Sequence, residues 1–220
     1  MNIFLGFFSM IACFSAVVLI EKLFKKEGLY VWISIATIIA NIAVCKTINI
    51  ASLTSTLGNI MFASNFLATD IISEKYGSNY SKKAIYMALF SVITFIISTQ
   101  LMLLFIPAKE DIAQDAMKSL FSINLRVSIS SIIMFILSNL LDIYLFDKIK
   151  QKIPNKLWLR NNIATIVSNC SENFFFNFFA FVGIFNIKTI LSIVLTVSII
   201  ETIIAICDTP FLYIAKKIVQ

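Results

Sequence analysis

The sequence predicts an all-α membrane protein with about six or seven transmembrane helices. Hydrophobic residues make up 59% of the 220 residues, whereas charged residues make up only 14%. A soluble globular domain averages about 25% charged residues, so this composition excludes an ordinary soluble domain. Several apolar runs also reach the roughly 20 residues that a helix needs to span a bilayer.

Seven apolar segments can be distinguished along the chain. The first has no basic leading region and no clear cleavage site of small residues, so we interpret it as a retained helix rather than a signal peptide. We expect a single membrane domain over residues 1–220. Within it, the N-terminal helix over residues 1–25 is either part of the core or an addition to a core of six helices. The segments fall at residues 3–21, 29–50, 57–73, 84–106, 120–147, 159–185 and 189–215.

The distribution of lysine and arginine predicts that the N-terminus lies outside and the C-terminus inside the cell. With that orientation 13 basic residues lie on the inner side and 4 on the outer side, and Arg126 lies within a span. Such a bias is the positive-inside rule of membrane proteins. It also accounts for the net charge of +6 without a nucleic-acid partner. We therefore predict a multi-pass protein of the bacterial cytoplasmic membrane.

The third segment is unusually short and polar. The run from Leu57 to Ile72 would form only about 24 Å of helix at 1.5 Å per residue. A connection of small and polar residues precedes it, over residues 47–58. One interpretation is a broken or re-entrant helix that lines a cavity, because irregular backbone at membrane depth must be buried or wet. The other is a short helix tilted against its neighbours. The segment carries Asn59, Ser64, Asn65 and Asp70.

One polar pattern occurs twice inside the later hydrophobic segments. On a helix its amide and its acid are three residues apart, so they share a face. An aspartate at the centre of a membrane helix costs roughly 2.5–3.5 kcal/mol on insertion scales, so a duplicated pattern favours a function. If the two helices are antiparallel neighbours, the four amide and acid side chains can surround one cavity in the inner half of the membrane. The two copies are Ser138-Asn139-Leu140-Leu141-Asp142 and Ser168-Asn169-Cys170-Ser171-Glu172.

Other charged residues in the spans allow two interpretations each. Glu201 falls near the centre of the last segment and is a candidate for ligand contact or an interhelical hydrogen bond. Asp70, near a helix end, could cap or pair with a loop as readily as bind a ligand. Asp208 precedes Thr209-Pro210, which favours a structural partner for a proline break. Arg126 could donate to a ligand or neutralise one of these acids.

Aromatic residues supply candidates for stacking on a planar ligand. Phe62 and Phe66 lie about one turn apart on the short third segment. The run from Phe174 to Phe181 is interpreted mainly as lipid-facing or packing residues, with one or two rings on the Glu172 side available for stacking.

The residue types in the duplicated pattern suit a ligand with hydrogen-bond donors. A carboxylate accepts two parallel N–H bonds, and an amide both donates and accepts. The guanine edge offers such donors, but a cationic amine or a proton relay would suit the same acids. The chain has no histidine, and its four cysteines are scattered, so we expect no metal site and no cofactor. The absence of a clear nucleophile–base pair also argues against an intramembrane enzyme.

Three stretches together resemble the queuosine precursor transporter family, also called the YhhQ or VUT family. The first runs from Gly58 to Gly77, reads GNIMFASNFLATDIISEKYG, and is preceded by the similar stretch 41–47. The second runs from Arg126 through Asp142 to Phe146, and the third from Trp158 through Glu172 to Gly183. A weaker match lies at Asp208-Thr209-Pro210-Phe211. The resemblance covers about residues 30–215.

This resemblance implies uptake of 7-deazapurine precursors of queuosine: queuine, or the cyano- and aminomethyl-deazaguanines. It also implies a fold akin to the substrate-binding subunits of energy-coupling-factor vitamin importers. The alternative function is a binding subunit of such an importer. No P-loop pattern occurs in the chain, so any ATP hydrolysis would have to come from a separate module. We expect a small-molecule substrate and the lipid bilayer as partners, no nucleic acid, and leave a homo-oligomer open.

The chain departs from the family pattern at four positions. Asn139 and Asn169 stand where glutamine or another amide is common, and Glu172 replaces an aspartate. Glu201 stands where a lysine is often found. The last change reverses a charge near mid-membrane, which favours an amine-bearing ligand such as queuine or the aminomethyl base.

Overall fold

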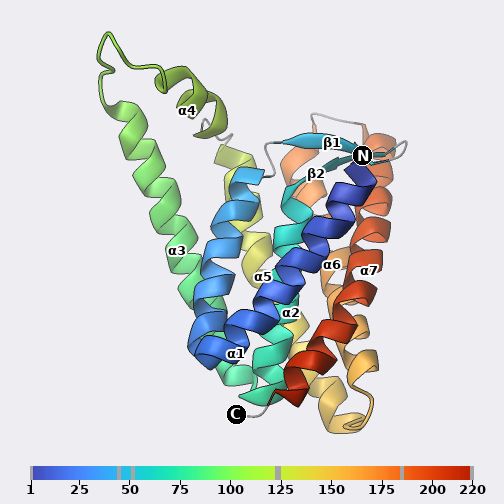
Figure 1. Cartoon of the computed structure of the whole chain (residues 1–220). Helices are drawn as coiled ribbons and strands as arrows, with labels where there is room; N and C mark the ends of the chain where they lie inside the picture. Colours follow the sequence, from blue (N-terminus) through green and yellow to red (C-terminus); the bar gives the residue numbers. More distant parts are fainter. Residues whose placement is uncertain (1, 44–45, 51–52, 122–124, 184–185, 219–220) are drawn as a thin grey trace.

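The computed structural model describes residues 2–43, 46–50, 53–121, 125–183 and 186–218, which form a bundle of long helices with a small β-hairpin at one end (Figure 1). An all-α membrane fold is thereby confirmed, with the hairpin as a short exception. The hairpin strands pair antiparallel. The elements are α1 (Asn2–Ala43), β1 (Thr47–Ile50), β2 (Leu53–Thr56), α2 (Gly58–Lys75), α3 (Ser78–Leu104), α4 (Gln114–Phe121), α5 (Leu125–Lys152), α6 (Leu157–Phe181) and α7 (Ile187–Lys217).

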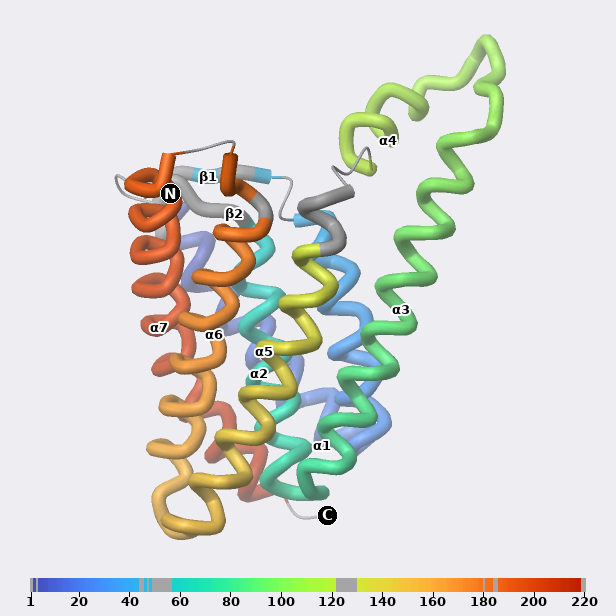
Figure 2. The backbone as a smooth tube through the Cα atoms, turned by 180° about the vertical axis from the view of Figure 1, so that it is seen from behind, coloured from blue at the N-terminus to red at the C-terminus, as the bar shows by residue number. Residues whose placement is uncertain are grey.

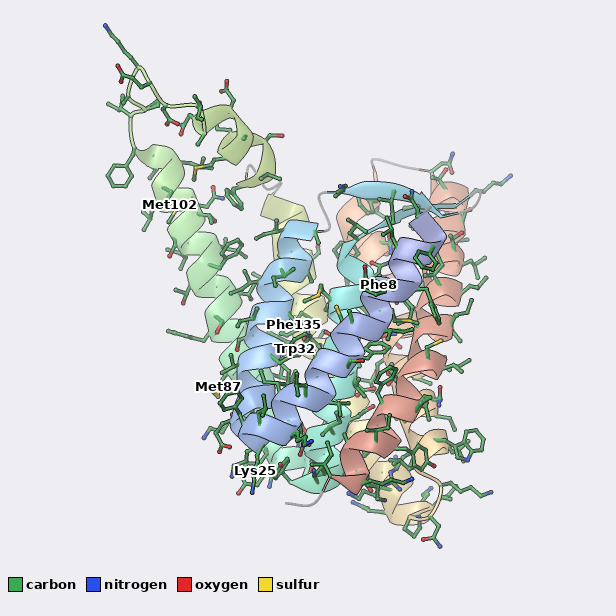
Figure 3. The ribbon with its side chains drawn as sticks, viewed as in Figure 1. Phe8, Lys25, Trp32, Met87, Met102 and Phe135 are labelled. Carbon is green, nitrogen blue, oxygen red and sulfur yellow. The ribbon has the colours of Figure 1, made fainter. Side chains whose placement is uncertain are left out.

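Helix α1 is two antiparallel arms joined by a sharp turn at the lower end of the bundle (Figures 1 and 3). Lys25 breaks the helix with φ 54° and ψ −141°. A Cβ at Gly28 would lie 2.7 Å from the Ile20 carbonyl oxygen and 2.8 Å from the Phe24 Cβ, so only glycine allows the arms to approach this closely. The arms correspond to the first two predicted segments.

The described part of the chain follows the seven-segment prediction. The two arms of α1 are followed by the long helices α2, α3, α5, α6 and α7. By length and composition, three helices of the described residues could cross a membrane: Phe4–Ala43, Ser78–Leu104 and Ile187–Lys217. The ends of the chain lie at opposite ends of the bundle (Figure 1), as an odd number of crossings requires.

Helix α2 is the centre of the bundle. Every residue from Ala63 to Ser73 is buried, and α1, α3, α5 and α7 all pack against the helix. Its apolar side chains, including Leu67 and Ile71, share one core with Phe14 of α1. The short helix is continuous from Gly58 to Lys75, and the polar connection before it is a hairpin. The short-helix interpretation is therefore correct, and the broken or re-entrant one is wrong.

The upper end of α3 and the helix α4 lean away from the bundle in both views (Figures 1 and 2). The Gln100 side-chain amide donates to the Phe121 carbonyl oxygen at 2.7 Å, and the rings of Phe95 and Phe121 pack edge to face at 5.9 Å. These contacts hold α4 against α3. Met87 and Met102 on α3 point away from the other helices (Figure 3), as expected for side chains in contact with lipid.

Candidate functional site

Both copies of the Ser-Asn-x-x-acid pattern lie in the interior, on the helices α5 and α6. The two helices run side by side and antiparallel (Figure 2). Glu172 is half-buried, and its Oε2 atom is fully enclosed. The fully buried members are Ser138, Asn139, Asp142, Ser168 and Asn169.

The carboxyl group of Asp142 faces that of Asp70 on the central helix α2. The two are within hydrogen-bonding reach of each other, and the Thr165 hydroxyl of α6 also faces Asp142. Asp208 of α7 lies near enough to interact electrostatically with both acids. The Asn161 side-chain amide donates to Asp208 Oδ1 at 2.7 Å. We call Asp70, Asp142 and Asp208 the Asp70 group.

A second pair of acids lies further along α6. Glu172 and Glu201 of α7 interact electrostatically, and the Ser138 hydroxyl faces Glu172. The Asn173 side-chain amide donates to Glu201 Oε2 at 2.6 Å. We call Glu172 and Glu201 the Glu172 pair. The interhelical hydrogen bond is one of the two alternatives for Glu201, and contact with a ligand stays a prediction.

The two acids of the duplicated pattern also face further helices. Asp142 faces α2 and α6, whereas Glu172 faces α5 and α7. That the four amide and acid side chains surround one cavity stays a prediction. The two acid groups lie at different heights along α6. Thr165 faces the first group and Glu172 belongs to the second, and the two residues are about 10 Å apart at 1.5 Å per residue. Asn169 lies between these levels on α6. The interior therefore contains two adjoining acid groups rather than one.

Hydrogen-bond acceptors are in excess around these acids. Buried polar groups are normally hydrogen-bonded, and leaving one unsatisfied costs about 1–3 kcal/mol. Carboxylate oxygens can only accept, so the interior requires donors from a proton, water or ligand. The oxygens that receive no hydrogen bond from the described residues are both of Asp70, both of Asp142, Oε2 of Glu172, and the amide oxygens of Asn65, Asn139, Asn161 and Asn169.

The predicted aromatic and amide candidates on α2 pack against neighbouring helices. The Phe62 ring lies edge to face with Phe66 at 5.5 Å and with Phe135 of α5 at 6.1 Å. The Asn65 side-chain amide donates to the Thr37 hydroxyl of α1 at 3.0 Å. These contacts join α2 to α5 and to α1, and the predicted role of the three side chains in ligand binding stays a prediction.

The outer aromatic run behaves as predicted. Phe174, Phe175, Phe178 and Phe179 are exposed on the surface of the bundle, where lipid would cover them. Arg126 lies on α5, but its side chain lies outside the described residues, so its two interpretations remain predictions.

An ion-pair cluster closes the end of the bundle below the Asp70 group. Glu74 contacts Arg160, Lys150 at 3.1 Å and Lys216 at 2.7 Å. Arg160 also donates to the Pro154 carbonyl oxygen at 2.6 Å. This Glu74 network, made of Glu74, Lys150, Arg160 and Lys216, ties α2 to α5, α6 and α7. The sequence interpretation treats its basic residues only as inner-side charges.

Sequence reasoning missed three polar residues of α6, Asn161, Thr165 and Asn173, that continue the stripe to which Ser168 and Glu172 belong. Asn161, Thr165, Ser168 and Glu172 recur at intervals of three or four residues, which is the spacing of one helical face. Asn173 adjoins the end of this stripe. The signal that identifies the set is a polar rather than an apolar periodicity in this segment, and it is visible in the sequence alone.

The surface of the protein also has a wide depression of about 600 Å³ between α1 and α3, far from the acids. Its lining includes Ser34 of α1 and Lys82 and Tyr86 of α3, and none of the acids of the two groups. The unsatisfied acceptors in the interior, rather than this depression, therefore mark the candidate site.

A helical membrane bundle with a buried row of acids and amides defines a membrane protein that handles a polar solute, because such residues are costly in lipid and usually functional. The chain belongs to the family described as "Putative vitamin uptake transporter", which matches residues 56–215. It is also 39% identical over 220 residues, or 99% of this chain and 96% of its relative, to the "Probable queuosine precursor transporter" of Bacillus subtilis (strain 168). No solved structure matches, so the predicted likeness to energy-coupling-factor subunits remains a prediction.

Proposed function

We propose that this protein imports a queuosine precursor of the 7-deazapurine type: queuine, or the 7-cyano or 7-aminomethyl form of 7-deazaguanine. The observation that carries the proposal is the excess of buried acceptor oxygens on α2, α5 and α6. Such an interior favours a ligand rich in N–H donors. The name of the Bacillus relative, a probable queuosine precursor transporter, supports the same class of ligand.

The guanine-like edge of these bases fits the acceptors in detail. It presents a ring N–H and an exocyclic NH₂ side by side, and one carboxylate can accept both in parallel. Glu172 is the proposed acceptor, because its Oε2 atom is enclosed and has no described donor. The free amide oxygens of Asn139 and Asn169 flank it, and Asp142 lies one turn beyond Asn139 on α5.

Glu201 favours the amine-bearing bases over the neutral cyano base. Its carboxylate interacts electrostatically with Glu172, and a cationic amine beside Glu201 would relieve the repulsion between the two acids while Glu172 binds the ring edge. Phe62, Phe66 and Asn65 complete the proposed site from α2, with the rings placed to contact a planar base. Arg126 is proposed as an outer contact or counter-ion of the same site.

Uptake by a bacterial host that lacks its own transporter tests the proposal. Cells that express this chain are expected to accumulate labelled queuine, and unlabelled aminomethyl-deazaguanine should compete better than the cyano base. Recovery of the unchanged base inside the cell would distinguish transport from an enzymatic reaction. Uptake no greater than in cells with an empty vector would contradict the proposed function.

We also propose that the N-terminus lies outside and the C-terminus inside the cell. The basic residues of the Glu74 network lie at the C-terminal end of the bundle, which the positive-inside rule assigns to the cytoplasm. Single cysteines introduced at Lys150 and at Asp111, in a variant without the native cysteines, should react with a membrane-impermeant thiol reagent from opposite faces. Reaction of both from the same side would contradict this topology.

A further inference from the structure

We propose that the Asp70–Asp142 pair binds the proton that drives import. This inference rests on the proposed function, and it adds the source of energy. The two carboxyl groups come from the helices α2 and α5 and lie within hydrogen-bonding reach of each other. Both side chains are completely buried, and none of their four oxygens receives a hydrogen bond from a described residue.

Two ionised carboxylates cannot stay in this arrangement without compensation. Like charges that share a buried site repel strongly, and each oxygen also loses its hydrogen bonds to water. One proton held between the two groups removes one charge and supplies the missing hydrogen bond. Dyads of this kind commonly hold a single proton between two acids.

The charged groups around the pair do not neutralise it. Asp208 on α7 adds negative charge, although the Asn161 amide partly satisfies its carboxylate at 2.7 Å. Arg160 on α6 acts on Asp70 from a distance, but its guanidinium is bound to Glu74 and to the Pro154 carbonyl oxygen.

Lys150 of α5 lies near the same end of α2 and donates to the Ser73 and Glu74 carbonyl oxygens, both at 3.2 Å, but its ion pair is with Glu74. On the α3 side, the Ser81 hydroxyl pairs with Ser73 at 2.7 Å and donates to the Thr69 carbonyl oxygen at 2.9 Å. Described residues therefore leave the pair without a cationic partner.

A hydroxyl group adjoins the pair. Thr165 is 2% exposed, and its hydroxyl faces Asp142. A hydroxyl can donate to a carboxylate or accept from a protonated carboxyl, so it serves both states of the pair. A metal ion is disfavoured, because the described residues contain no group of three or more acids, cysteines or histidines arranged to hold one.

The position of the pair links the proton to both the substrate and the closed end of the bundle. Asp142 shares a face of α5 with Asn139, which the proposed function assigns to the substrate. Asp70 lies one turn from Glu74, whose ion pairs join four helices. Asp70 lies between the proposed substrate contact at Asn139 and the ion pairs of Glu74. Protonation of Asp70 removes a negative charge there, so binding and release of the proton can alter both the substrate contact and the ion pairs.

The proposed cycle is balanced in protons and charge. One proton from the outer solution binds the pair while one molecule of the base binds at Glu172. Both are released to the cytoplasm, and the pair returns without its proton. Import of a neutral base therefore carries one positive charge inward, and a gradient of one pH unit supports accumulation of up to about tenfold.

The purified full-length chain in liposomes tests this proposal with labelled 7-cyano-7-deazaguanine, which is uncharged. Wild-type protein is expected to accumulate the base when the outside is made acidic, and not under a sodium gradient alone. Asp70→Asn should keep equilibrium binding within about twofold and keep exchange of internal for external base. It should lose accumulation against a gradient, because an amide cannot gain and lose the proton. Asp208→Asn is the matched control, since its carboxylate already has a donor, and it should retain accumulation.

The outcomes separate the proton proposal from the proposed function. Three results would overturn the proton proposal and leave the proposed function standing. Asp70→Asn could still accumulate the base under a proton gradient, or Asp208→Asn could lose that accumulation. The wild type could instead take up the base under a sodium gradient alone. A wild type that neither binds nor moves any deazapurine would overturn the proposed function.

Infrared spectroscopy then tests the pair without a substrate. The wild type at neutral pH should show the carbonyl band of a protonated carboxyl, and Asp70→Asn should lose it. Its absence from the wild type would refute the proposal. If Asp70→Asn does not fold, Asp70→Glu replaces it and should keep both the band and proton-driven accumulation.

Discussion

Replacing Glu74 with glutamine is expected to cause a large loss of stability at the closed end of the bundle. The Arg160 side chain is 1% exposed and that of Glu74 is 6% exposed, so the variant leaves a buried guanidinium without its anionic partner. Removing one member of a buried ion pair costs about 3–5 kcal/mol. Thermal unfolding of the purified protein in detergent should show a transition well below that of the wild type.

A matched control is available in the same network. Lys216 also contacts Glu74, at 2.7 Å, but its side chain is 48% exposed. Exposed ion pairs contribute about 0–1 kcal/mol, so Lys216→Gln should unfold close to the wild-type temperature. Equal transitions for Glu74→Gln and the wild type would mean that Arg160 does not depend on this carboxylate.

The sequence predicted the features that depend on local composition. Apolar run length located the long helices, and spacing placed Asn139 with Asp142 and Asn169 with Glu172 on interior faces. The short third helix was one of two alternatives, because its length and polarity set the segment apart without deciding between them. Each of these properties can be evaluated within one segment of about 20 residues.

Features that depend on contacts between distant segments could not be predicted. Asp142 pairs with Asp70 because α5 packs on the central helix, and no spacing within either segment encodes that contact. Without it, Asp142 appeared to belong with Glu172. Arg160 was assigned to the inner surface as a topological charge, since its burial against Glu74 follows only from the packing of α6 on α5 and α7, which brings its side chain to the end of α2.

Two local conformations also escaped the sequence interpretation. The hairpin over 47–56 forms outside the helices, where threonine and isoleucine favour strand pairing. The turn at Lys25 has a positive φ without a glycine at that position, so residue type gave no signal for it. The nearby Gly28 marks the close approach of the two arms instead.

Replacing Glu172 with glutamine is expected to weaken binding of queuine and of the cyano base by ten- to a hundredfold. The change removes an ionised acceptor and places an NH₂ group against the donors of the base. Loss of a charge-assisted hydrogen bond is worth about 1.5–3 kcal/mol, which corresponds to that range of affinity. Both ligands should be affected alike, because they share the guanine-like edge and differ elsewhere.

Equilibrium binding of the labelled bases to purified protein measures the effect of Glu172→Gln directly. The control is Glu27→Gln, the same exchange at a side chain that is 67% exposed in the turn of α1, far from the acid groups. It should bind within about twofold of the wild type. If Glu172→Gln also binds normally and is folded, Glu172 does not hold the donor edge. A loss confined to the amine-bearing base would instead place Glu172 against the amine, and would leave Asn139, Asn169 and Asp142 as the acceptors that recognise the ring.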